Sequence, residues 1–243
     1  NIGIYIFSYN FASITNILLG EPLKFAINPL VYIQEDNAQK LRRFLINSAN
    51  YYYIIGCFVC LAIAILGKYI FLLMVKNNRF YAGWSVVPLI SFAYVHHGLG
   101  TILGKGLTMA KKPFIISGTV LIAAGINVCL NFVFIPIWGI LGAAVATLIS
   151  YLAWNILKIY YSAKFYQLYF DSKRLLYITL IGVGLYSLSF FIANTQNIMF
   201  NIFIKLLIIA MYPFIFFFTG FFTDKEKRFI KNFIAKHCFC IKT

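Results

Sequence analysis

Long apolar runs alternate with short polar and basic segments along nearly the whole chain. A run of about 18 or more apolar residues is long enough for an α-helix to cross a bilayer. Seven runs meet this length, and each is predicted to be a transmembrane helix. The predicted spans are Ile2–Ile33, Ser48–Val75, Trp84–Leu103, Pro113–Ile135, Trp138–Tyr161, Leu175–Ala193 and Met199–Phe222. The expected fold is therefore an all-α, polytopic membrane bundle of about seven helices.

The first run differs from the others because polar groups interrupt it. Asn10, Ser13, Glu21, Lys24 and Asn28 fall on one stripe of a regular α-helix. Ionisable side chains are costly in a membrane and usually face a protein interior or a water-filled cavity. We therefore predict that this stripe lines a substrate cavity, where Lys24 meets an anionic group and Glu21 meets a cation or a proton.

A second interpretation of the same residues stays open. Glu21 and Lys24 are three residues apart on the predicted helix, so they can form a neutralised pair that seals a contact between helices. Pro22 and Pro29 in this run each remove a backbone N–H, and we expect the helix to be tilted or bent.

Composition supports a membrane protein and excludes an ordinary soluble domain. The 243 residues are 62% hydrophobic and only 11% charged, whereas soluble domains carry about 25% charged residues. A net charge of +15 could suggest a nucleic-acid partner. The lysines and arginines lie in short clusters between apolar runs, however, as they do in membrane loops, so we expect no nucleic-acid partner.

The distribution of Lys and Arg predicts the topology. If all seven runs span, only Lys68, Lys76 and Arg79 fall on one side, and most of the 21 basic residues fall on the other. The positive-inside rule makes the basic side cytoplasmic, so the chain starts outside and its C-terminus is cytoplasmic. The basic side receives Lys40, Arg42, Arg43, Lys105, Lys111, Lys112, Lys158, Lys164, Lys173, Arg174, Lys225, Lys227, Arg228, Lys231, Lys236 and Lys242.

The tail, residues 223–243, is predicted to be a basic amphipathic helix on the cytoplasmic surface. Its apolar face would bind the inner leaflet while its lysines contact anionic membrane lipids, although a solvated tail remains an alternative. The apolar face consists of Phe229, Ile230, Phe233 and Ile234.

The five cysteines do not form a disulfide framework or a metal site. Cys57 and Cys60 lie inside an apolar run and are expected to pack as small hydrophobic residues. Cys238 and Cys240 lack a second pair of ligands. We therefore expect no metal and no cofactor. Because Asn1 already stands in apolar sequence, we also expect that this chain is a fragment with further sequence upstream.

Two further polar pairs lie within predicted spans and are weaker cavity candidates. His96 and His97 are adjacent, so they point to different faces of a helix, and packed histidines are the commoner case. Asn127 and Asn131 share a face and suit either cavity lining or a hydrogen bond between helices. The glycines after His97 lack the spacing of a phosphate-binding loop, so ATP hydrolysis is not expected.

The most patterned segment is a hairpin of small residues, N-x3-N-x4-P-x2-G-x2-GAA-x-AT. We expect a tight turn at Pro136 and Gly139 on the outer surface, followed by a small-residue stripe that lets a neighbouring helix approach closely. The stripe consists of Gly139, Ala143, Ala146, Ser150 and Ala153.

This hairpin, "NVCLNFVFIPIWGILGAAVATLISY", resembles the signature hairpin of the polysaccharide, or O-antigen, flippases of the MOP exporter superfamily. "GIYIFSYNFASITNILLGEPLKFAINPLVY" resembles the opening of their second lobe, and "GLGTILGKGLTMAKKP" their next matching helix. The resemblance covers residues 1–161, whereas residues 162–222 fit as two further spans by topology alone. The family usually has an uncharged residue at the position of Glu21. In this protein, Glu21 either serves a protein-specific ion coupling or only pairs with Lys24.

The resemblance implies a transporter rather than an enzyme. Family members translocate a lipid-linked oligosaccharide, usually on polyprenyl diphosphate, across the bacterial cytoplasmic (inner) membrane for surface polysaccharide biosynthesis. They have two lobes around a cavity that opens alternately to each side, and basic cavity residues would meet the diphosphate. This chain resembles the C-terminal half, so its partner would be the missing N-terminal lobe of the same protein.

Other functions remain possible from the sequence. A peptidoglycan-precursor flippase or a cation-coupled multidrug exporter would have the same architecture, although an exporter should have more acidic cavity residues. A membrane polysaccharide polymerase or an acyltransferase would need a large external loop or a buried His/Asp/Arg cluster. A purely structural scaffold would have no use for the polar stripe of the first run.

Overall fold

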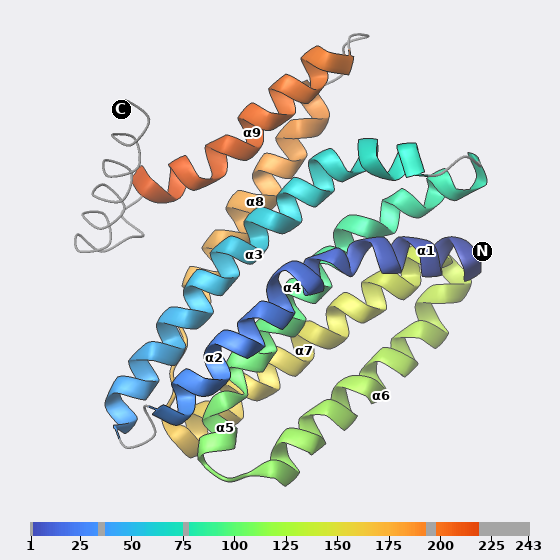
Figure 1. The fold of residues 1–243 in the computed structure, drawn as a ribbon. Coiled ribbons are helices and arrows are strands. Elements are labelled where there is room, and N and C mark those ends of the chain that lie inside the picture. Colours follow the sequence, from blue (N-terminus) through green and yellow to red (C-terminus); the bar gives the residue numbers. More distant parts are fainter. Residues whose placement is uncertain (1, 34–36, 75–77, 193–197, 219–243) are drawn as a thin grey trace, which may run out of the picture. The chain divides into compact units, whose positions relative to one another are not determined.

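A computed structural model describes residues 2–33, 37–74, 78–192 and 198–218, and the elements in these ranges are all helical (Figure 1). The elements are α1 (Ile2–Ala12), the π-helix η1 (Asn16–Gly20), α2 (Glu21–Ile33), α3 (Ala38–Met74), the 3-10 helix η2 (Asn78–Val86), α4 (Val87–Leu103), α5 (Lys105–Met109), α6 (Pro113–Trp138), α7 (Ile140–Tyr166), α8 (Ser172–Ile192) and α9 (Ile198–Phe218). The all-α prediction is confirmed. The predicted tail helix, residues 223–243, lies outside the described residues.

The chain forms two compact units, which are described separately. The first unit, Asn1–Tyr186, contains α1 to α7 and most of α8. The second unit, Ser187–Thr243, contains the end of α8 and all of α9. Within α9, the rings of Tyr212 and Phe216 lie 4.9 Å apart, and both side chains are buried.

Six helical segments of the described chain are long and apolar enough to cross a membrane. They correspond to the second to seventh predicted runs, so this is a multi-pass membrane protein. The segments are Ala38–Phe71, Gly83–Met109, Pro113–Trp138, Ile140–Tyr166, Ser172–Ile192 and Met199–Phe217.

The first predicted run, Ile2–Ile33, is not one continuous α-helix. It is divided into α1, η1 and α2, so none of its pieces alone has the length of a span. In η1, the backbone N–H of Glu21 bonds to the carbonyl of Asn16, five residues earlier. The wider π turn comes immediately before Pro22, which has no N–H to donate and whose ring would crowd the preceding turn. The predicted bend is therefore a π-helix before Pro22, whereas α2 continues through Pro29.

Two helix boundaries also differ from the predicted ones. α3 begins at Ala38 rather than Ser48, so Lys40, Arg42 and Arg43 lie in its first turns and not in a loop. At the hairpin, α6 continues through Pro136 to Trp138, and the reversal occurs at Gly139 alone. Pro136 has no N–H to donate to the preceding turn, yet α6 continues for two more residues.

Gly139 adopts a backbone conformation with φ of +57° and ψ of −128°. Residues with a Cβ rarely adopt such backbone angles, and the strain costs on the order of 1–3 kcal/mol. We expect Gly139→Ala to lower the melting temperature of the purified protein. Gly118→Ala in α6 is a matched control, because among the described residues nothing lies within 4 Å of its added Cβ. An equal melting temperature for both variants would contradict the assigned turn.

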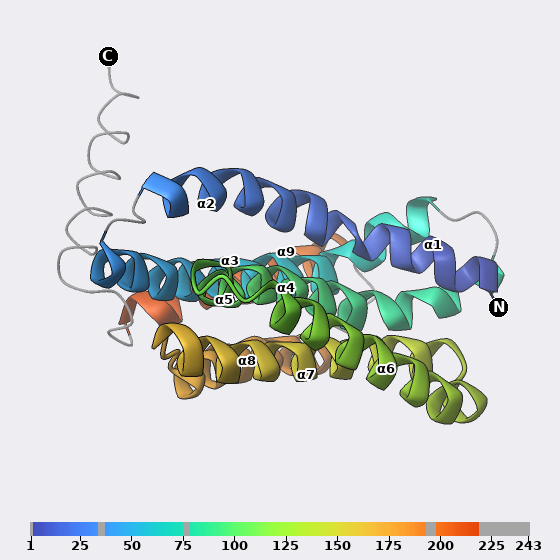
Figure 2. The same ribbon diagram turned by 90° about the horizontal axis from the view of Figure 1, so that it is seen from below.

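α4 is the central helix of the first unit. Figure 2 shows it in a middle layer, with α1 and α2 on one side and α6 and α7 on the other. It packs against α3 and α7 and is contacted by α1 and η1. At one end of the bundle, Phe11, Phe71 and Trp84 form a core of edge-to-face aromatic contacts, with Phe71 fully buried. Such contacts stabilise the junction of α1, α3 and η2.

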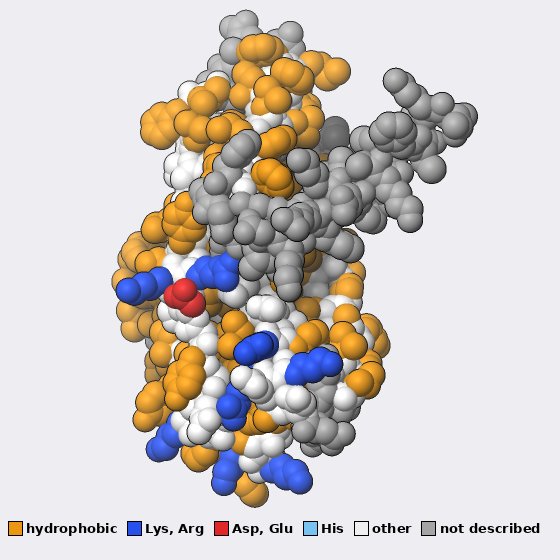
Figure 3. Space-filling model, turned by 90° about the vertical axis from the view of Figure 1, so that its left-hand side faces the viewer, with side chains coloured by type: hydrophobic (Ala, Val, Ile, Leu, Met, Phe, Trp, Pro, Cys, Tyr) orange, Lys and Arg blue, Asp and Glu red, His pale blue; other side chains and the backbone are white. Residues whose placement is uncertain are grey.

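The opposite end of the first unit carries the basic residues. This is where α3 and α8 begin and where α5 and α7 end (Figure 1). Figure 3 views this end of the first unit and shows Lys and Arg side chains distributed over it. The exposed basic residues of these segments are Lys40, Arg43, Lys111, Lys112, Lys164 and Lys173. Clustering at one end of the helices is the arrangement that the positive-inside rule requires of one membrane face.

Candidate functional site

Lys158 is the most unusual polar residue in the bundle. It lies in α7 and is only 4% exposed, whereas the topology prediction placed it with the basic residues of the cytoplasmic side. Its Nζ donates a hydrogen bond to the carbonyl of Gly100 at 2.7 Å and lies 3.3 Å from the ring centroid of Trp154. Among the described residues, no carboxylate lies within ion-pair distance of it. The amine is therefore held by a carbonyl and an aromatic face, and a bound anion would favour its protonated form.

Lys158 belongs to a row of three side chains that join α7 to α4. Each side chain donates a hydrogen bond to a backbone carbonyl of α4, at 2.7–3.0 Å. The three donors share one face of α7 because they are three and four residues apart. The pairs are Asn155 with the carbonyl of His96, Lys158 with that of Gly100, and Ser162 with that of Leu103.

Two glycines of α4 and its C-terminal end make room for this row. A Cβ at Gly100 would lie 2.5 Å from Oδ1 of Asn155 and 3.0 Å from the ring of Trp154. A Cβ at Gly104 would lie 3.2 Å from Nζ of Lys158. Since real Cβ contacts are rarely so short, glycine at both positions is what lets the bulky side chains of α7 lie against α4.

Two more lysines lie in α2 or in contact with it. Nζ of Lys105, in α5, donates to Oδ1 of Asn28 in α2 at 2.7 Å. Nζ of Lys24 pairs with Oε1 of Glu21 at 2.8 Å, and the two side chains are 37% and 45% exposed. Asn16 donates to the same carboxylate oxygen at 3.5 Å. Three of the five predicted stripe residues are thus engaged in ion pairs or hydrogen bonds here.

His97 lies between the α2 and α7 groups. Its ring stacks on Trp154, with centroids 5.6 Å apart and planes 27° apart. Lys24, Glu21 and Lys158 are close enough to interact with it electrostatically. Its Nδ1 is buried and has no hydrogen-bond partner in the part of the chain that the structure describes. His97 is therefore connected to both lysine-bearing helices.

His96 has a different environment, as expected for an adjacent residue on another helix face. Its Nδ1 faces the amide Nδ2 of Asn155 at 3.2 Å, and its Nε2 faces the hydroxyl of Tyr53 at 3.3 Å. The Tyr53 hydroxyl is also 2.7 Å from Oγ1 of Thr179. These contacts join α3, α4, α7 and α8 within the first unit.

The remaining sequence candidates lie apart from the lysines. Asn10 is exposed, and its carbonyl accepts a hydrogen bond from Ser13 at 2.6 Å. Nδ2 of Asn131 donates to Oδ1 of Asn127 at 3.0 Å, within α6. Because a π-helix separates Ser13 from Glu21, the regular spacing assumed for the stripe does not hold across it.

Sequence reasoning missed Lys158 and Lys105 because both were counted only as cytoplasmic basic residues. Lys158 stands near the end of the predicted span Trp138–Tyr161, and Lys105 follows the span Trp84–Leu103. A signal was present for Lys158: Asn155, Lys158 and Ser162 have helical spacing and share one face of α7. No comparable pattern marks Lys105.

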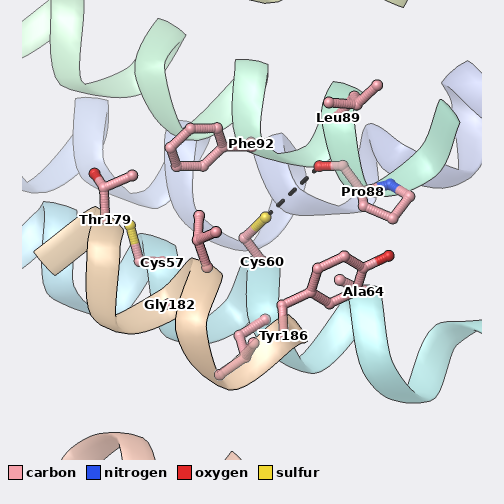
Figure 4. Close-up of a pocket in the computed structure, with 11 residues that line it drawn as sticks. Cys57, Cys60, Ala64, Pro88, Leu89, Phe92, Thr179, Gly182 and Tyr186 are labelled. Atoms are coloured by element: carbon pink, nitrogen blue, oxygen red, sulfur yellow. Dashed lines mark hydrogen bonds between the residues drawn. The ribbon is translucent and has the colours of Figure 1, made fainter. Parts of the chain in front are cut away.

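A separate apolar cavity of about 160 Å³ lies between α3, α4 and α8 (Figure 4). Cys57 and Cys60 line it, and both are buried. Sγ of Cys60 contacts the carbonyl of Pro88 at 3.8 Å. The expectation that these cysteines pack among apolar residues agrees with their positions.

The comparisons with known proteins identify the fold and no more. No protein-family model matches the sequence. An uncharacterized membrane protein of Methanocaldococcus jannaschii is 25% identical over 107 residues, which are 44% of this chain and 21% of that protein. A solved structure of the lipid II flippase MurJ, in an inward closed conformation, matches with a TM-score of 0.66 and 16% identity. The match covers 88% of this chain and 47% of the flippase, so the chain spans about half of its length. This chain therefore has the helical membrane-bundle fold of part of a lipid II flippase.

Proposed function

We propose that this chain is one lobe of a MOP-type flippase that moves a lipid-linked oligosaccharide with a diphosphate headgroup across a membrane. The shared fold supports transport rather than catalysis, and the match to about half of the flippase chain supports a second lobe that completes the transporter. In this proposal, the headgroup crosses in a wet cavity between the lobes while the polyprenyl tail stays in lipid.

The observation that carries this proposal is the buried amine of Lys158, which has no carboxylate partner among the described residues. A buried cation without a carboxylate is unfavourable unless an anion compensates for it. Lys158 is 4% exposed, and its partners among the described residues are the Gly100 carbonyl and the Trp154 ring. Lys24 in α2, and Lys105, which is hydrogen-bonded to Asn28 of α2, supply further positive charge. Phosphate oxygens are suitable ligands for such a group because each can accept a charge-assisted hydrogen bond.

The substrate of the whole transporter has two candidates with the same diphosphate linkage. One is an O-antigen or other polysaccharide precursor, which the hairpin and the opening segment of the sequence favour. The other is a peptidoglycan precursor, which is favoured by the lipid II flippase as the matched structure. A multidrug exporter for cations fits less well, because the side chains that meet across α2, α4 and α7 are mainly basic.

In this proposal the basic end of the first unit faces the cytoplasm of a bacterial cell, and the substrate moves from the inner to the outer leaflet. The residues that bind it are Lys24, Lys105 and Lys158, with Asn28 and Glu21 holding two of them in place. Residues 223–243 would bind anionic lipids of the inner leaflet.

Reconstitution tests the function directly. The full-length protein, including its upstream sequence, is placed in liposomes with fluorescent undecaprenyl-diphosphate oligosaccharide or with lipid II. We expect one substrate to become accessible to an external glycosidase or lectin much faster than in protein-free liposomes. The preferred substrate distinguishes polysaccharide export from peptidoglycan synthesis. Equal rates with and without protein, for both substrates, would contradict the proposal.

A further inference from the structure

The two adjacent histidines differ in whether they can accept a proton. At His96 the proton positions follow from the hydrogen bonds. The amide nitrogen of Asn155 also donates to the His96 carbonyl at 3.0 Å, and a carbonyl only accepts, so this nitrogen is a donor toward Nδ1. The ring proton of His96 is therefore on Nε2, facing the Tyr53 hydroxyl at 3.3 Å.

The next hydrogen bonds in this series also run away from His96, each group donating to the following one. The Tyr53 hydroxyl then donates to Oγ1 of Thr179 at 2.7 Å, and Thr179 donates to the carbonyl of Leu175 at 3.0 Å. A second proton on His96 would have to sit on Nδ1, where it would face the N–H of Asn155, which is itself a donor. His96 is thus held as a neutral imidazole with both ring nitrogens occupied.

His97 has the opposite properties. Nδ1 of His97 is a buried atom with no partner among the described residues. The ionisable groups that face the ring are Glu21 and Lys24 from α2 and Tyr151 and Lys158 from α7. η1 contributes no ionisable side chain, and Glu21 is already paired with Lys24. The Glu21–Lys24 pair is neutral as a whole, so in the unliganded site Lys158 is the group that opposes a positive charge on His97.

We propose that His97 is a proton-binding site coupled to the neighbouring anion site, so that the protein takes up a proton there when a lipid diphosphate binds. This inference rests on the proposed function. An anion at Lys158 offsets the charge that opposes protonation of His97, and a proton on His97 in turn strengthens binding of the anion. Such coupling is reciprocal by thermodynamic necessity. As a result, binding of the diphosphate would be accompanied by binding of one proton at His97, which is unprotonated in the empty site.

The test measures binding to the full-length protein in nanodiscs between about pH 6 and pH 8, where a histidine changes charge. The probe is farnesyl-diphospho-N-acetylglucosamine. Each of its two phosphates carries one ester and one anhydride bond, so each keeps a single, constant negative charge in this range. We expect the affinity of the wild-type protein to rise as pH falls, by up to about tenfold per pH unit for one linked proton. His97→Asn should remove this slope, whereas His96→Asn should retain it.

A second measurement keeps the test valid if either variant is unstable. In weakly buffered solution with a pH dye, binding should take up protons in the wild-type protein and none in His97→Gln. A pH slope or a proton uptake that persists without His97 would overturn the inference. So would a wild-type protein that binds the probe with neither a pH slope nor a proton uptake. Both results would leave the proposed function standing. A folded wild-type protein that binds no probe at any pH would overturn the proposed function as well.

Discussion

Replacement of Lys158 by methionine is expected to slow the flipping of a lipid-linked diphosphate by about 10- to 100-fold, the value of one hydrogen bond to a charged group. Methionine retains the length and apolar stem of the side chain, so the contact with Trp154 is largely preserved. The charge is lost, and a buried anion then has no cation to compensate for it. The rate is measured in liposomes with equal amounts of protein.

Two further variants separate the charge of Lys158 from its hydrogen bond to α4. Lys158→Gln can still donate to the Gly100 carbonyl but carries no charge, so we expect it to be as slow as Lys158→Met. Lys164→Met, in the last turn of the same helix and exposed, is the matched control and should flip at the normal rate. Normal flipping by Lys158→Gln would show that Lys158 acts as a structural donor between helices.

Gly142→Ala is expected to destabilise the α6–α7 hairpin by about 1–3 kcal/mol, because the added methyl group has no space. Gly142 is buried, and its Cβ would clash with the backbone carbonyl of Phe134 on the facing helix. Backbone atoms cannot move aside as a flexible side chain can, so the two helices must separate. Thermal unfolding of the purified protein, followed by fluorescence, measures the change.

Gly125→Ala is the matched control for this substitution, since it also changes a glycine of the hairpin. Within the described part of the chain, nothing lies within 4 Å of a Cβ at Gly125. Alanine is a better helix former than glycine, so this variant should be neutral or more stable by up to about 1 kcal/mol. An equally stable Gly142→Ala protein would mean that α6 and α7 are farther apart than described.

The close approach of α6 and α7 was partly predictable. The small-residue stripe indicated that a helix would pack closely on α7, and Ala146 and Ser150 of that stripe are indeed buried. The stripe did not include Gly142, which makes the closest approach. Its role depends on the turn at Gly139, which sets which faces of the two helices meet.

The interpretation of the first run shows the limit of helical projection. A stripe from Asn10 to Asn28 assumes one uninterrupted α-helix. The π-helix before Pro22 changes the register between Ser13 and Glu21, and local backbone geometry of this kind is not visible in a hydropathy pattern. The ion pair of Glu21 and Lys24 was predictable, because both residues lie on the same side of that break.

The sequence by itself determined which segments lie in the membrane and which end of the bundle is basic. Both follow from the solvent that each side chain prefers, and this preference belongs to the residue wherever it is placed. Only the tertiary structure decided that Lys158 is buried, that Lys105 is hydrogen-bonded to Asn28, and that both ring nitrogens of His96 have partners while Nδ1 of His97 has none among the described residues. These properties depend on contacts between α2, α4 and α7, which are far apart in the chain, and on glycines that determine how closely the helices approach.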